Sequence, residues 1–296
     1  MAEASSPSVR PDRFKFPVPT ADLPLWIALA ILAVPTIAAL GRQVWNTEAG
    51  AHGPIVVAVG GWLLFQEFAG AKDLKRPGSM VLTLAALILS LALYVFGRAF
   101  DFISLEVAGL YGAGVSMLYS RIGLRALAHL WFPVAYLAFL VPPPGWLMDE
   151  LTAPLKQFVS WASMSILSAA GIPVAREGVT IYVAGYQLLV EDACSGMNSM
   201  VGLVAVSLLY IYLLRGSHLR YAALLVLAAI PIAIVGNILR IMTLILLTYF
   251  FGDEVAQGFL HTVSGIFLFA VDLLLVFMLD QFLWKVLPAS WKDKRA

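Results

Sequence analysis

Eight long apolar stretches constrain the fold of this chain more than any other feature of its sequence. They lie near residues Leu23–Leu40, Gly53–Ala69, Ser79–Phe96, Phe102–Tyr119, Leu124–Val141, Met197–Leu214, Tyr221–Phe251 and Val255–Leu279. A membrane-crossing helix needs about 20 mostly apolar residues, because no water in the hydrocarbon satisfies the backbone groups. Only 12% of the residues are charged, whereas soluble domains carry about 25%. We therefore predict an all-α polytopic membrane protein with about eight transmembrane helices, and exclude soluble enzymes, disordered proteins and nucleic-acid-binding proteins.

The basic residues predict how these helices are oriented. Of the 19 Lys and Arg residues, 14 fall in the N-terminal leader, in alternate loops or in the C-terminal tail. Loops rich in Lys and Arg stay in the cytoplasm, so both termini are predicted to be cytoplasmic. The predicted organisation is a polar leader over 1–22, an integral membrane domain over 23–285 with its catalytic core near 142–270, and a basic tail over 286–296.

The segment between the fifth and sixth predicted spans then lies outside the membrane. After the helix-breaking run Pro142-Pro143-Pro144-Gly145, the stretch Leu155–Ala170 is predicted to be an amphipathic helix in the interface plane. Further along, apolar residues alternate on both sides of Ala184-Gly185, which predicts a small β-hairpin. This hairpin leads directly into the sixth span.

Three reactive side chains fall at one predicted depth, near the outer face. Cys194, the only cysteine, lies at the outer end of the sixth span, where the hairpin leads into it, and His261 lies near the start of the eighth span. Arg240 lies about 20 residues after the start of the seventh span at Tyr221, which brings it close to the outer interface. A lone cysteine is usually an apolar filler, a boundary histidine is usually a satisfied interfacial group, and an arginine near a helix end can snorkel to headgroups. Ionisable residues within membranes are nevertheless expensive and indicate function.

Together, a thiol, an imidazole and a guanidinium provide the groups needed for acyl transfer through a thioester. The helix that begins at Ser195-Gly196 presents backbone N–H groups that stabilise a thiolate at Cys194. Histidine moves protons near neutral pH, and an arginine stabilises a developing oxyanion. No cofactor or metal is expected, since one cysteine excludes a thiolate-rich site. The group that orients the histidine stays open among Glu191, Asp192, Asn237 and Asp253.

The same residues resemble the motifs of a known family, the exosortase/archaeosortase family. The resemblance rests on Glu191-Asp192-Ala193-Cys194-Ser195-Gly196-Met197-Asn198-Ser199, on Asn237-Ile238-Leu239-Arg240, and on His261 with Gly265. It implies a membrane-embedded cysteine peptidase or transpeptidase in which Cys194 is the nucleophile, His261 the acid/base and Arg240 the stabiliser of substrate or oxyanion. The supporting residues would be Glu191, Asp192, Ser195, Gly196 and Asn237.

The resemblance also implies the substrates and the location. Family substrates are secreted proteins whose C-terminal sorting tail has a short motif, a transmembrane helix and a basic cluster. Cleavage would take place on the periplasmic side of a bacterial inner membrane, with water or an amine resolving the thioester. The expected partners are these proteins and membrane lipids, with no nucleic acid.

Two other classes of function compete with this hypothesis. A transporter or flippase of lipid-linked glycans would carry ionisable residues along the whole membrane depth. Here they cluster at one face, apart from Glu67 and Asp272; Glu106 lies toward the outer face. A structural partner in an envelope complex would not need its single cysteine. The sequence assigns no role to Glu67, Glu106 or Asp272.

Overall fold

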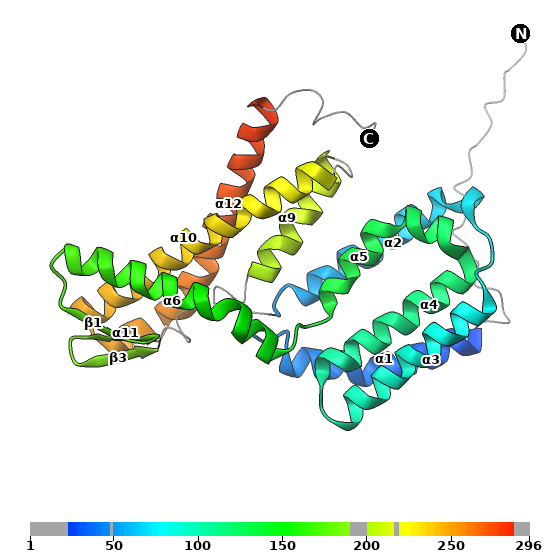
Figure 1. Cartoon of the computed structure of the whole chain (residues 1–296), viewed down its shortest axis with the longest axis horizontal. Helices are drawn as coiled ribbons and strands as arrows, with labels where there is room; N and C mark the ends of the chain where they lie inside the picture. The colour runs from blue at the N-terminus through cyan, green and yellow to red at the C-terminus, as the bar shows by residue number, and fades with distance from the viewer. Residues whose placement is uncertain (1–22, 48–49, 190–199, 216–218, 258, 287–296) are drawn as a thin grey trace, which may run out of the picture.

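The structure is a computed structural model that describes residues 23–47, 50–189, 200–215, 219–257 and 259–286. Its helices form two lobes (Figure 1). The N-terminal lobe contains α1 (Leu23–Gln43), α2 (Gly53–Gly70), η2 (Lys72–Leu74), α3 (Met80–Ala99), α4 (Ile103–His129), α5 (Trp131–Leu137) and η3 (Ala138–Leu140). The C-terminal lobe contains α6 (Gly145–Ala169), β1 (Val174–Glu177), β2 (Thr180–Val183), β3 (Tyr186–Leu189), α9 (Met200–Arg215), α10 (Leu219–Phe251), α11 (Asp253–Gln257) and α12 (Phe259–Val286).

The predominantly helical architecture predicted from the sequence is confirmed. Within the part of the chain that the structure describes, three helices are long and apolar enough to cross a membrane: α1, α3 and residues Ala223–Phe251 of α10. A fourth candidate is the pair formed by α4 and α5–η3, whose axes bend by 106°. Helices occupy most of the described residues of each of the eight apolar stretches, with a break at Leu130 inside the fifth. That each stretch crosses the membrane remains a prediction.

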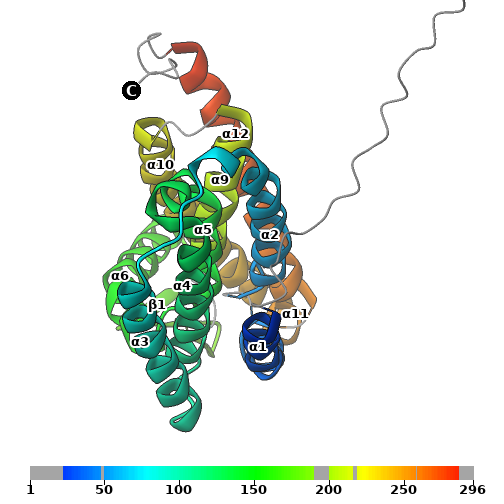
Figure 2. The ribbon, with the colours of Figure 1, turned by 90° about the vertical axis from the view of Figure 1, so that its right-hand side faces the viewer.

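Close backbone contacts hold the N-terminal lobe together. Figure 2 shows α4 between α3 on one side and α1 on the other, and α4 packs against both. A Cβ added at Gly97 would lie 2.2 Å from the backbone nitrogen of Glu106, and one at Gly109 would lie 2.4 Å from that of Tyr94. Small residues allow such approaches, which is how membrane helices gain packing energy without a hydrophobic driving force.

Gly123 interrupts α4 between two of the predicted spans. Its φ of 69° and ψ of 180° are not helical, and φ is in the region that favours glycine. A Cβ there would lie 2.3 Å from the carbonyl oxygen of Arg76. The predicted separation of Phe102–Tyr119 from Leu124–Val141 therefore corresponds to a kink within one assigned helix.

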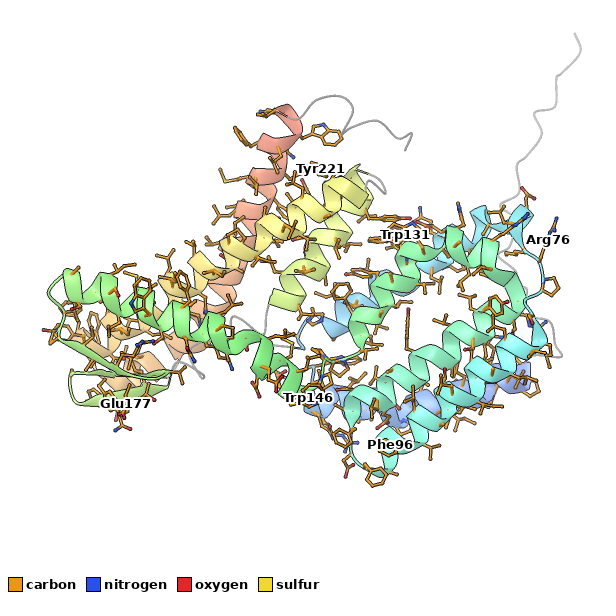
Figure 3. All side chains as sticks on the ribbon, in the orientation of Figure 1. Arg76, Phe96, Trp131, Trp146, Glu177 and Tyr221 are labelled. Carbon is orange, nitrogen blue, oxygen red and sulfur yellow. The ribbon has the colours of Figure 1, made fainter. Side chains whose placement is uncertain are left out.

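Residues predicted for opposite sides of the membrane lie at opposite ends of the molecule. In Figure 3, Arg76 and Tyr221, both predicted to be cytoplasmic, lie in the upper half, whereas Phe96, Trp146 and Glu177, predicted for the outer side, lie in the lower half. The lower end in this view is called the outer end below. Which end faces the cytoplasm remains a prediction.

The segment before the described start of α9 differs from the prediction in two respects. Helix α6 begins at Gly145 rather than at Leu155, because it accommodates Pro154 in its interior. The predicted hairpin is present as β2 and β3, which pair antiparallel around a turn with positive φ at Ala184 and Gly185. A third strand, β1, pairs with β2 and completes a sheet of order β1-β2-β3.

Candidate functional site

Arg240 and Asn237 lie one turn apart in the outer half of α10. Their exposed fractions are 2% and 4%, so both polar side chains are buried among helices. A buried charged or amide group is costly unless other groups satisfy it. Both positions were predicted from the sequence, and the structure places them together on one helix.

Helix α6 and the sheet fix this part of α10 from one side. Ile241 and Ile245 of α10 pack in a buried cluster with Val159 of α6 and Ile181 of β2. The Ser163 hydroxyl of α6 donates a hydrogen bond to the carbonyl oxygen of Ile238, at 3.4 Å. The outer segment that the sequence placed before the sixth span therefore serves to position the helix that carries Arg240.

Helix α12 packs antiparallel to α10. Tyr221 near the start of α10 contacts Trp284 near the end of α12, with ring centroids 5.6 Å apart. Toward the outer end, the Asp272 carboxylate lies directly against the backbone of Gly236, since a Cβ there would be 2.2 Å from Asp272 Oδ1. This contact sets the register between the two helices, one turn from Arg240.

The register places residue 261 relative to Arg240. Residues 261 and 272 lie about three turns apart and share a face of α12, just as Gly236 and Arg240 share a face of α10. Arg240 is therefore one turn beyond Gly236 toward the outer end, and residue 261 is about three turns before Asp272 toward the same end. At about 1.5 Å per residue, residue 261 lies about 16 Å along α12 from the Gly236–Asp272 contact, and Arg240 lies about 6 Å along α10 from it. Residue 261 is therefore roughly 10 Å nearer the outer end than Arg240 is.

The remaining predicted site residues lie outside the part of the chain that the structure describes. These are Glu191, Asp192, Cys194, Ser195 and Gly196. The flanking elements are described: β3 ends at Leu189 on the sheet that packs on α10, and α9 begins at Met200 and also packs on α10. The side chain of His261 is likewise outside the description.

Two of the carboxylates without a predicted role have partners that join helices. Glu106, buried in α4, accepts a hydrogen bond from the Thr36 hydroxyl of α1 at 2.7 Å. It also forms an ion pair with Arg98 of α3 at 3.3 Å. Glu67 of α2 accepts a hydrogen bond from Tyr212 of α9, which joins the two lobes. Both groups therefore have structural explanations.

Sequence reasoning did not single out another buried carboxylate, Asp280. It is fully buried in α12 and accepts hydrogen bonds from the hydroxyls of Tyr210 in α9, at 2.9 Å, and Tyr221 in α10. The predicted eighth span ended near Leu279, one residue before Asp280. The sequence does contain a sign that Asp280 lies within the helix, because further apolar residues follow it up to Val286.

Among the described residues, no group of three or more His, Cys, Asp and Glu side chains could hold a metal ion. The chemistry that the described groups offer is thus that of a buried guanidinium and amide on α10, beside a carboxylate on α12.

Comparison with models of known protein families assigns the chain to one family. The family described as transmembrane exosortase (Exosortase_EpsH) matches residues 44–278, which covers both lobes. No curated protein and no solved structure matches the chain. Because the match extends over most of the sequence, this chain is a member of the transmembrane exosortase family.

Proposed function

We propose that this protein is a cysteine peptidase or transpeptidase that cleaves the C-terminal sorting tails of secreted proteins through a thioester. Cys194 is the nucleophile, His261 the acid/base and Arg240 the stabiliser of the oxyanion or substrate. Glu191, Asp192, Ser195, Gly196 and Asn237 support them. The enzyme works in a bacterial inner membrane with both termini in the cytoplasm and its site on the periplasmic side.

The proposed reaction has two steps. In the first, the Cys194 thiolate attacks the scissile carbonyl carbon, and the oxyanion that forms is stabilised by Arg240. The intermediate collapses with loss of the tail amine, which takes a proton from His261, and the substrate carboxyl end remains as a thioester. In the second, water or an acceptor amine gives a proton to His261, attacks the thioester and releases the thiolate.

The observation that carries this proposal is the burial of Arg240 in α10, one turn after Gly236, whose backbone lies against Asp272 of α12. A guanidinium is permanently charged and offers planar donors. Its 2% exposure within an apolar helix gives those donors a low-dielectric environment, in which they stabilise an oxyanion more strongly than in water. Residue 261 belongs to α12, about three turns before Asp272 and toward the same end.

The proposal is tested by co-expressing the enzyme with a secreted reporter that ends in a short motif, an apolar helix and a basic cluster. The wild-type chain is expected to shorten the reporter, and Cys194→Ala is expected to leave it intact at an equal amount of enzyme in the membrane. Met278→Ala, at a position exposed on α12, is the matched control and is expected to process normally. Undiminished processing by Cys194→Ala would refute the assignment of the nucleophile.

A further inference from the structure

A cavity of about 220 Å³ lies at the outer end, where the two lobes meet. Its walls come from four separate segments: the turn after α1, the end of η3 with the proline run, the first turns of α6, and the first turn of α9. The residues that matter below are Trp45, His52, Phe139, Met148, Asp149 and Val201. None of them belongs to the candidate site on α10 and α12.

Close packing shapes this cavity. The indole of Trp45 lies directly on the backbone of Gly53, where an added Cβ would be 2.2 Å from its Nε1 atom. The His52 side chain lies near α9, because a Cβ at Gly202 would be 3.5 Å from it, an ordinary van der Waals distance. The wall at Trp45 is therefore set by a close backbone approach within the N-terminal lobe, and His52 faces α9 of the other lobe.

The size and chemistry of the cavity suit an apolar side chain. A cavity of about 150 Å³ holds a benzene molecule, so this one has room for one large apolar side chain or two small ones. Phe139, Met148 and Val201 supply apolar surface, and Asp149, which pairs with Lys156 at 3.4 Å, adds a polar group. Binding sites of this kind combine mostly apolar walls with a few polar groups.

The cavity is close to the predicted nucleophile along the chain. Val201 lies in the first described turn of α9, and the sequence predicts that this helix begins at Ser195. Cys194 is seven positions before Val201, and a chain reaches at most about 3.5 Å per residue, so Cys194 lies within roughly 25 Å of this wall of the cavity. An extended peptide advances about 3.3 Å per residue, so the cavity lies within about seven residues of a bond cleaved at Cys194.

We infer that this cavity is the specificity subsite that receives an apolar side chain of the sorting tail, within about seven residues of the scissile bond. The inference rests on the proposed function and adds to it the place where the tail is read. It predicts that residues filling the cavity reduce processing of the tail without changing the chemistry at the cysteine.

The first test fills the cavity from α6. Met148→Trp is expected to lower the rate of reporter processing about tenfold or more, since pocket contacts typically discriminate by 10- to 200-fold. Alkylation of Cys194 by iodoacetamide should proceed at the wild-type rate. Leu151→Trp is the matched control, because Leu151 lies one turn later on α6 and is 61% exposed; it should process normally.

The second test enlarges the cavity and changes the substrate. In a reporter series, the apolar tail residue near the cleavage site is replaced by Trp, and Phe139→Ala is expected to process this tail better than the wild-type enzyme does. Equal processing by Met148→Trp and wild type, with an unchanged tail preference in Phe139→Ala, would overturn the subsite. Failure of the wild-type enzyme to process any tail would instead overturn the proposed function.

Discussion

Arg240 is 2% exposed in α10, a helix of 33 residues whose remaining side chains are mostly apolar. The sequence predicts its depth, because helical rise from the start of the apolar stretch is fixed. It does not predict what surrounds Arg240, since the packing of α6, the sheet and α12 depends on contacts between distant segments. The same limit applies to Asp272, whose position against Gly236 emerges only from the register of two helices.

At the residue scale, Arg240→Lys is expected to lower kcat for tail processing by about 10²- to 10³-fold, the range for removing an oxyanion donor. The reason is that an ammonium is a point charge and lacks the planar donor set of a guanidinium. Arg98→Lys, at an arginine whose side chain is 50% exposed, should stay close to wild type. Turnover close to wild type in Arg240→Lys would contradict the role of Arg240 in stabilising the oxyanion and would leave it a membrane anchor.

At the scale of elements, the apolar stretches predicted helices well, and the exceptions have physical causes. Strand β1 was not predicted because Val174–Glu177 is short and carries two charges; it forms by pairing with β2. Helix α6 continues through Pro154, which sequence rules treat as a break. In both cases tertiary contacts outweigh the local preference.

The packing of α10 on α12 gives a prediction about Gly236. Gly236→Ala is expected to destabilise the protein by about 1–3 kcal/mol, the usual cost of overpacking, because the new Cβ would lie 2.2 Å from Asp272 Oδ1. The measurement is thermal unfolding in detergent. Combining it with Asp272→Ala should recover part of the loss.

The control for this prediction is Gly61→Ala on α2, where an added Cβ meets nothing within 4 Å. It should leave the unfolding temperature unchanged or slightly higher, since alanine favours helix over glycine. Equal unfolding temperatures for Gly236→Ala and Gly61→Ala would contradict the register between α10 and α12.

At the scale of the whole molecule, the charge distribution predicted which residues share a side of the membrane, and Figure 3 places the labelled examples accordingly at two ends. The division into two lobes was not predicted. It depends on the contact of Tyr212 in α9 with Phe132 in α5, whose rings stack 3.7 Å apart, and with Glu67 in α2. Neither contact has a signature in the sequence.

The orientation is testable with single cysteines in a Cys194→Ala background. Glu177→Cys, on the exposed sheet, should react with a membrane-impermeant maleimide in intact cells. Asp73→Cys, exposed in η2, should react only after the membrane is permeabilised. The reverse pattern would place the candidate site in the cytoplasm.

The measurement that tests the central claim most directly is the mass of the enzyme during turnover. Purified protein is mixed with a tail-bearing peptide, quenched in acid and analysed by mass spectrometry. The account predicts an acyl adduct at Cys194 that adds the mass of the N-terminal hydrolysis product less one water, and that hydroxylamine removes, as it does a thioester. Cleaved product that forms while Cys194 stays unmodified, and that still forms with Cys194→Ala, would contradict it.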